Sequence, residues 1–149
     1  MEDKKDFEFI EHTADIKVKI YGDTLKQLFQ NGLVALFQTV LPKAKGCFIR
    51  EGREFCSSFP IARKISVTSG TKETLLIDFL SEVLCLMDTY DEAYGEINIQ
   101  ILSDTELVGT LHGIPVASYR GEDVKAATYH ELSIDKVGDT WEAIVTFDV

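Results

Sequence analysis

The chain has 149 residues, a length that suits one folded domain, and 45% of them are hydrophobic, enough to build a sizeable core. Fifteen basic residues against 25 acidic ones give a formal net charge of −10. Proteins that bind nucleic acid by themselves usually have an excess of basic residues, and this chain has the opposite balance. Its charge favours basic proteins or cations as partners. A local group opposes that field: Lys43, Lys45, Arg50 and Arg53.

The cysteines and the first residues bear on the cellular compartment. Cys47, Cys56 and Cys85 are odd in number and include no Cys-x-x-Cys pair, which fits neither a secreted disulfide framework nor a zinc ribbon. Cys85 lies in an apolar helical run, so we expect it to be buried. Residues 1–6 are charged and lack an apolar signal region, and no stretch approaches the roughly 20 apolar residues of a membrane span. We therefore expect a cytoplasmic protein without membrane contact.

The first part of the chain predicts strands. Residues 7–10 alternate weakly and indicate a short strand or the lead-in to one. Residues 15–21 alternate clearly, with isoleucine and valine pointing one way and lysine and tyrosine the other. This period of two is typical of a strand with one solvent-exposed face.

Two helices are predicted. Thr24 begins the first, because its hydroxyl can accept hydrogen bonds from free backbone N–H groups and Gln27 completes a capping-box pattern. Apolar residues at helical spacing continue to Val40, and Pro42 ends the helix. The second helix covers residues 72–87, and its apolar stripe is wide enough to be buried on much of its circumference.

Strands dominate the remaining sequence. Residues 43–60 are the least regular and suggest a strand only around residues 47–50, whereas residues 64–69 alternate. From Gly95 onward four segments alternate in part: residues 96–102, 107–112, 125–134 and 141–149. The sequence therefore predicts a single α+β domain over residues 1–149, with two main helices packed on a largely antiparallel β-sheet.

Signatures of common catalytic sites are missing. The sequence contains no Gly-x-x-x-x-Gly-Lys phosphate loop, no Gly-x-Ser-x-Gly nucleophile elbow and no His-Glu-x-x-His helix. Cysteine and histidine occur, but nothing in the sequence pairs them. We therefore expect a protein that is not itself an enzyme.

Two acidic segments far apart in the chain predict a candidate cation site. Glu-His-Thr-Ala-Asp at residues 11–15 either forms a turn or presents Asp15 as an oxygen ligand for Mg²⁺ or Ca²⁺, with His12 orienting it or contacting a partner. The alternating C-terminal segment is either a solvated tail or a strand locked into a sheet. In the second case the carboxylates of Asp148 and Val149 lie close together, and a cation between them would relieve their repulsion. The site also requires Asp15 on a neighbouring strand, which the sequence leaves open.

Five segments resemble the archease family in order and spacing, and together they cover nearly the whole chain. They are His-Thr-Ala-Asp at 12–15, Gly-x-Thr-Leu at 22–25, Leu-Leu-Ile-Asp-Phe-Leu-Ser-Glu at 75–82, Val-Lys-Ala-Ala-Thr-Tyr-His at 124–130 and Phe-Asp-Val at 147–149. The resemblance implies an α+β accessory protein that activates a GTP-dependent tRNA-splicing RNA ligase by promoting its guanylylation and multiple turnover. It implies that the protein contacts RNA only through that ligase, and that the ligase itself joins the RNA ends.

The resemblance also implies a metal site. Its ligands would be Asp15 and Asp148, with Val149 adding a backbone or carboxylate oxygen, and the cofactor would be Ca²⁺ or Mg²⁺.

The loop before the Val-Lys-Ala segment departs from the family pattern. Residues 116–121 keep Arg120 but lack the Asp and His that are often found there in the family. A charged loop is ordinarily a solvated turn, but its mixed charges also suit a protein-docking rim. On the resemblance, we expect Arg120, Asp123 and Lys125 to contact the ligase, together with His12.

Two other hypotheses stay open. One is a general acidic chaperone or interaction module without a metal, which would bind basic proteins in a salt-sensitive way and tolerate Asp148→Asn. The other is a small hydrolase that uses Asp15, His12 and Asp148 for acid–base work, although the sequence shows no nucleophile for it.

Overall fold

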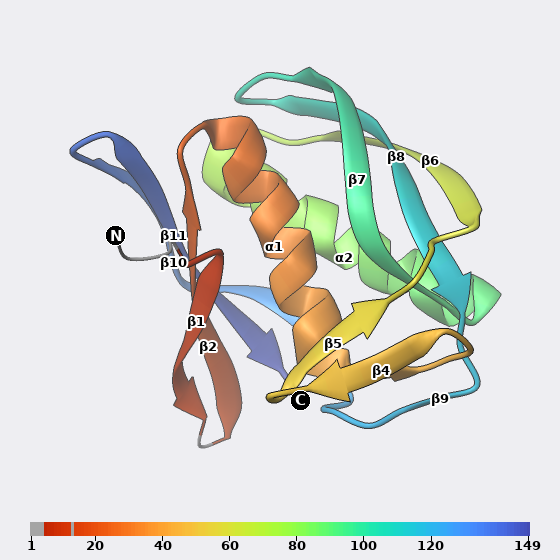
Figure 1. Ribbon diagram of the computed structural model, residues 1–149. Helices are drawn as coiled ribbons and strands as arrows, with labels where there is room; N and C mark the ends of the chain where they lie inside the picture. The colour runs from red at the N-terminus through yellow and green to blue at the C-terminus, as the bar shows by residue number, and fades with distance from the viewer. Residues whose placement is uncertain (1–4, 13) are drawn as a thin grey trace.

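The computed structural model describes residues 5–12 and 14–149, and Figure 1 shows two helices that lie between two antiparallel sheets. One sheet has the strand order β1-β2-β11-β10, and the other has the order β6-β8-β7. The strands of the first sheet are β1 (Phe7–His12), β2 (Asp15–Gly22), β11 (Thr140–Asp148) and β10 (Ala126–Val137). Those of the second are β6 (Ile61–Thr68), β8 (Glu106–Pro115) and β7 (Glu92–Leu102).

Each helix packs against both sheets. Helix α1 (Leu25–Val40) contacts β2 on one side and β7 on the other, while α2 (Lys72–Tyr90) contacts β10 on one side and β6 and β7 on the other. Both helices therefore carry core residues around much of their circumference. The predicted α+β class and the antiparallel pairing are confirmed, but the strands form two main sheets instead of one. No helix in the described part of the chain is long and apolar enough to cross a membrane.

The helix ends follow local signals. The Thr24 side chain accepts from the Gln27 N–H at 3.0 Å, as predicted, but the Gln27 side chain accepts from the Asp23 N–H at 2.6 Å instead of returning to Thr24. Leu41, in a left-handed conformation, ends α1 directly before Pro42. Helix α2 extends to Tyr90, three residues past its predicted end. Asp91, in a left-handed conformation, caps the helix there.

Strand β11 is hydrogen-bonded along both edges. It pairs with β2 and with β10, both antiparallel, so the C-terminal strand lies inside the sheet. Its residues Ala143, Val145 and Phe147 are buried, opposite the equally buried Ile20, Val18 and Ile16 of β2. Of the two alternatives that the sequence left open for this segment, the structure therefore shows the strand locked into a sheet and not the solvated tail.

A two-stranded hairpin lies outside the main sheets. It consists of β4 (Cys47–Arg50) and β5 (Arg53–Cys56), joined by a two-residue turn with positive φ at Glu51 and Gly52. Such turns match the natural twist of a hairpin. Strand β4 agrees with the sequence prediction, whereas β5 was not expected. Two further short strands, β3 (Pro42–Lys43) and β9 (Ser118–Tyr119), pair with each other.

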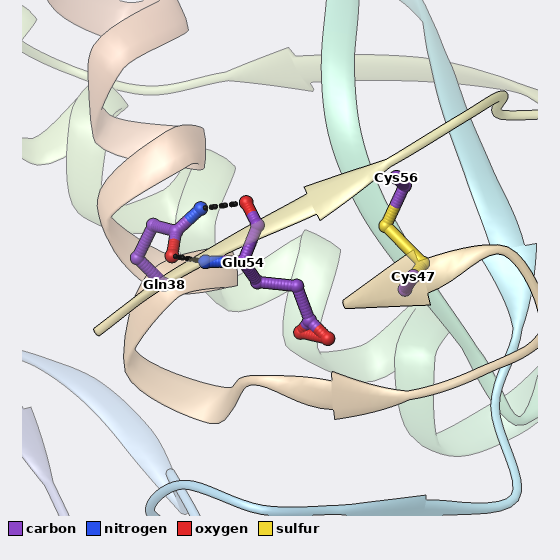
Figure 2. Close-up of a disulfide and its surroundings, with 4 residues drawn as sticks. All are labelled: Gln38, Cys47, Glu54 and Cys56. Atoms are coloured by element: carbon purple, nitrogen blue, oxygen red, sulfur yellow. Dashed lines mark hydrogen bonds between the residues drawn. A yellow bond between two sulfur atoms is a disulfide. The ribbon is translucent and has the colours of Figure 1, made fainter. Parts of the chain in front are cut away.

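The cysteines differ from the expectation. Cys47 and Cys56 face each other across the hairpin and form a disulfide (Figure 2), which the odd cysteine count did not suggest. Cys85 is exposed instead of buried, because the apolar run of α2 is wider than the stripe that the two sheets cover.

The same hairpin buries a carboxylate. Glu54 is 3% exposed, and neither of its carboxylate oxygens has a hydrogen-bond partner among the described residues. Figure 2 shows that the Gln38 side chain of α1 forms two hydrogen bonds with the Glu54 backbone. Its Nε2 donates to the carbonyl at 2.9 Å, and its Oε1 accepts from the N–H at 2.8 Å. Burial raises the pKa of Glu54, and the Arg120 guanidinium opposes the rise in part.

This raised pKa predicts a pH-dependent effect of Glu54→Gln. Because the folded pKa lies above the unfolded one, ionised Glu54 destabilises the wild type as the pH rises through that window. We expect Glu54→Gln to increase the free energy of unfolding by about 1–3 kcal/mol at neutral pH, and to match the wild type below about pH 4, where both side chains are neutral. Urea denaturation at both pH values measures this, with exposed Glu82→Gln as control. An equal gain at both pH values would contradict the assignment.

Candidate metal site and docking surface

Strands β2 and β11 bring Asp15 and Asp148 together. The two residues are direct partners in the antiparallel register, a position in which Cβ atoms lie about 4.5–5.5 Å apart. Their neighbours Ile16 and Phe147 point into the core, with 3% and 0% exposure. Because side chains alternate along a strand, both aspartates lie on the outer face of the sheet, where they are exposed. The adjacency that the sequence left open is therefore present.

The aspartate side chains have no protein partner in the described part of the chain. Neither Asp15 nor Asp148 forms a side-chain hydrogen bond or ion pair with the other described residues. The next pair along the outer face contains Lys17, whose ammonium group pairs with Glu131. The carboxylates of Asp15 and Asp148 therefore place two like charges opposite each other on neighbouring strands. This arrangement destabilises a sheet unless a cation bridges the two charges.

The donor atoms fit a hard cation. Carboxylate oxygens are the ligands that Mg²⁺ and Ca²⁺ prefer, whereas zinc sites use mainly histidine and cysteine. Val149 is the residue after Asp148, and its half-buried side chain packs against the core. Among the described residues no group of three or more His, Cys, Asp or Glu side chains gathers. A cation held by Asp15 and Asp148 would therefore take its remaining oxygens from the backbone, the chain end or water.

His12 is placed only in part. Its backbone pairs with Ile16 at the end of β1. Its side chain and the whole of Thr13 lie outside the described residues. The roles expected for His12, orienting the aspartate or contacting a partner, therefore stay predictions.

The charged loop closes the end of α1. Three consecutive N–H groups after Tyr119 donate to carbonyls at the end of α1 and its cap: Arg120 to Leu41, Gly121 to Val40 and Glu122 to Thr39, at 2.8, 3.0 and 3.0 Å. These bonds satisfy carbonyls that a helix end otherwise leaves unpaired. The side chains of Arg120, Asp123 and Lys125 are exposed, and the Lys125 N–H donates to the Asp148 carbonyl at 2.8 Å. The loop and the aspartate pair thus adjoin on the surface.

A hollow of about 660 Å³ lies between α2 and this loop. Asp88 and Asp123 contribute acidic groups to its wall beside Tyr119, Cys85 and Lys125. Burial raises the pKa of Tyr119, and the negative charges of Asp88, Asp91 and Asp123 add to the rise. This hollow suits a basic side chain of a protein partner.

Asp78 links a helix to a strand, a role that the sequence did not predict. One carboxylate oxygen accepts from the Tyr129 hydroxyl, and the other accepts from Ser69 Oγ at 2.7 Å. Strand β10 is thereby tied to α2. The only sequence signal was that Asp78 and Tyr129 belong to segments of the family resemblance.

Comparison with known proteins decides the family. The model of the Archease protein family (MTH1598/TM1083) matches residues 7–149. The chain belongs to the archease family. It is 30% identical to protein archease of Methanosarcina acetivorans, with 97% of each chain covered, and 32% identical to that of Pyrococcus furiosus, with 97% of this chain and 99% of the relative covered.

Solved structures agree. The solution structure of Methanobacterium thermoautotrophicum protein 1598 matches with a TM-score of 0.71 and 27% identity, over 97% of this chain and 99% of the other. A Thermotoga maritima crystal structure described as an archease and possible chaperone has a TM-score of 0.64 over the whole of both chains; at 21% identity it shows the fold alone. The family resemblance seen in the sequence is thus confirmed, and the protein is an archease-type accessory protein.

Proposed function

We propose that the chain binds a divalent cation and activates a GTP-dependent tRNA-splicing RNA ligase by promoting its guanylylation and multiple turnover. The observation that carries the metal is the pairing of Asp15 with Asp148, two exposed carboxylates without a partner among the described residues. Family membership supports the ligase as the partner. The net charge of −10 favours a protein partner over broad contact with RNA.

The chain's own residues would hold the cation in a fixed place. Asp15 and Asp148 would each supply carboxylate oxygens to Ca²⁺ or Mg²⁺, and Val149 would add a backbone or carboxylate oxygen. Pairing of β11 on both edges limits movement of these ligands, and the Lys125 amide bond to the Asp148 carbonyl adds to that restraint. When bound, the cation supplies positive charge that helps to load or position nucleotide on the ligase.

The docking surface would surround the metal. Arg120, Asp123 and Lys125 are exposed on the loop that joins Asp148 through the Lys125 N–H, and His12 precedes β2. We propose these four residues as ligase contacts. Bond-making stays with the ligase, so no residue of this chain receives a catalytic role.

Ligase guanylylation tests the proposal. Adding the protein with Ca²⁺ or Mg²⁺ to the ligase of the same organism should raise the yield of covalent ligase–guanylate, measured with labelled GTP. Asp148→Asn should lower that yield to the level of the ligase alone, whereas Asp139→Asn, an exposed change in the β10–β11 turn, should act like the wild type.

Two outcomes would count against the proposal. Full stimulation by Asp148→Asn would remove the role of the aspartate pair. Salt-sensitive binding of many basic proteins, unaffected by a chelator and without any rise in guanylylation, would favour the general acidic chaperone.

A further inference from the structure

We propose that the outward face of the β4–β5 hairpin binds single-stranded RNA directly, with bases stacked on Phe48 and Phe55 and phosphates held by Arg50 and Arg53. This proposal does not depend on the metal site. It goes beyond the indirect contact with RNA that activation of a ligase requires.

The strand register places these four side chains on one face. Phe48 is the cross-strand partner of Phe55, and Arg50 is the partner of Arg53. The two phenyl rings are 52% and 42% exposed, and they stack with centroids 5.9 Å apart and an interplanar angle of 28°. Because side chains alternate, the disulfide and Glu54 occupy the other face of the hairpin. An aromatic pair is thus presented to solvent beside two guanidinium groups.

The outward face of the hairpin carries two arginines, although the chain as a whole carries a net charge of −10. Residues 47–56 contain two basic and two acidic residues; the acidic ones are Glu51 in the turn and Glu54, which is buried on the other face. Arg50 forms no hydrogen bond or ion pair with other described residues. Arg53 donates to Asp6 at 3.1 Å and lies over the Phe7 ring, but its side chain is still 42% exposed. Like charges that face each other across two strands repel, and a polyanion would relieve this repulsion.

The hairpin is held in shape before any ligand arrives. The disulfide closes its base, the two-residue turn closes its tip, and Gln38 fixes the backbone of β5 (Figure 2). Stiff presentation lowers the entropy cost of binding. An exposed and rigid aromatic pair is therefore a platform ready for stacking.

Single-stranded RNA fits this face better than the other candidates. Every base has a π-face that can stack on an aromatic ring, and every linkage has a phosphate for an arginine. In a duplex the base faces are already covered. The positive local charge favours a phosphate polymer over a protein segment, since a protein partner would need a matching acidic stretch.

Fluorescence anisotropy with a labelled single-stranded oligoribonucleotide of about 12 nucleotides tests the proposal at low salt; this length lies within the roughly 4–16 nucleotides that a single-strand-binding fold covers. We expect saturable binding by the full chain that Phe48→Ala and Phe55→Ala each weaken by about tenfold or more. Arg50→Ala should weaken binding and flatten its salt dependence. Ile101→Ala, an equally exposed apolar change on β7, is the control and should bind like the wild type.

Several outcomes would overturn this inference: no saturable binding, equal affinity for a duplex of the same sequence, or unchanged affinity in a Phe48→Ala/Phe55→Ala double variant with native circular dichroism. Loss of ligase binding in that variant without RNA binding by the wild type would make the face a protein-docking surface instead. Asp148→Asn should keep RNA affinity while it abolishes ligase stimulation, so failures of the two proposals can be told apart.

Discussion

Asp15→Ala and Asp148→Ala should each abolish binding of one Ca²⁺ or Mg²⁺ per chain. The two carboxylates face each other on neighbouring strands, and either one alone leaves too few fixed oxygens for these cations, which take six or more ligands. Isothermal titration of the wild type should show a single site. Asp139→Ala removes a different exposed aspartate and should leave that site intact.

Stability measurements test the same site in a second way, because the variant should be more stable than the wild type without metal and less stable with it. Without metal the two carboxylates repel, so Asp148→Asn should be more stable than the wild type by about 0.2–1 kcal/mol. With metal at about a hundredfold excess over its dissociation constant, only the wild type should gain about 2.7 kcal/mol. Thermal denaturation with a chelator and with added Ca²⁺ measures both effects. Variants that bind metal and gain stability like the wild type would show that the ligands lie elsewhere.

Gly121→Ala should lower the free energy of unfolding by about 2–4 kcal/mol. A Cβ at this position would collide with the Thr39 carbonyl oxygen and would lie 3.0 Å from the Val40 carbonyl group. Both are backbone groups at the end of α1, so the loop has to move away. Movement breaks the three N–H bonds by which the loop caps the helix, each of which contributes about 0.5–1.5 kcal/mol.

Urea denaturation measures this loss against a matched glycine. A methyl group added at Gly70 would meet open space, and the φ of this residue is ordinary, so Gly70→Ala should change stability by no more than about 0.5 kcal/mol. Because the loop at Gly121 also carries Arg120 and Asp123, Gly121→Ala should weaken ligase stimulation at temperatures where the variant is folded. A Gly121→Ala protein as stable as Gly70→Ala would show that the loop is not a cap of α1.

Local patterns in the sequence predicted most of the elements. The period of two in β2 and the helical spacing between Thr24 and Pro42 depend on neighbouring residues alone, because one buried face imposes each of them. The same applies to the alternation of β11, which left a locked strand and a solvated tail as alternatives. The residues themselves suggested Asp15 and Asp148 as candidate ligands, and the family resemblance added that both belong to one metal site.

Only the tertiary structure decided how these elements meet. The pairing of β2 with β11, which joins Asp15 to Asp148 across most of the chain, is a long-range contact, and no local pattern identifies which strands become neighbours. The division of the strands into two sheets arises in the same way, and so does the burial of Glu54, whose hairpin is held against α1 by Gln38. Alternation shows which side chains share a face of a strand, but packing against the rest of the molecule determines whether that face is buried.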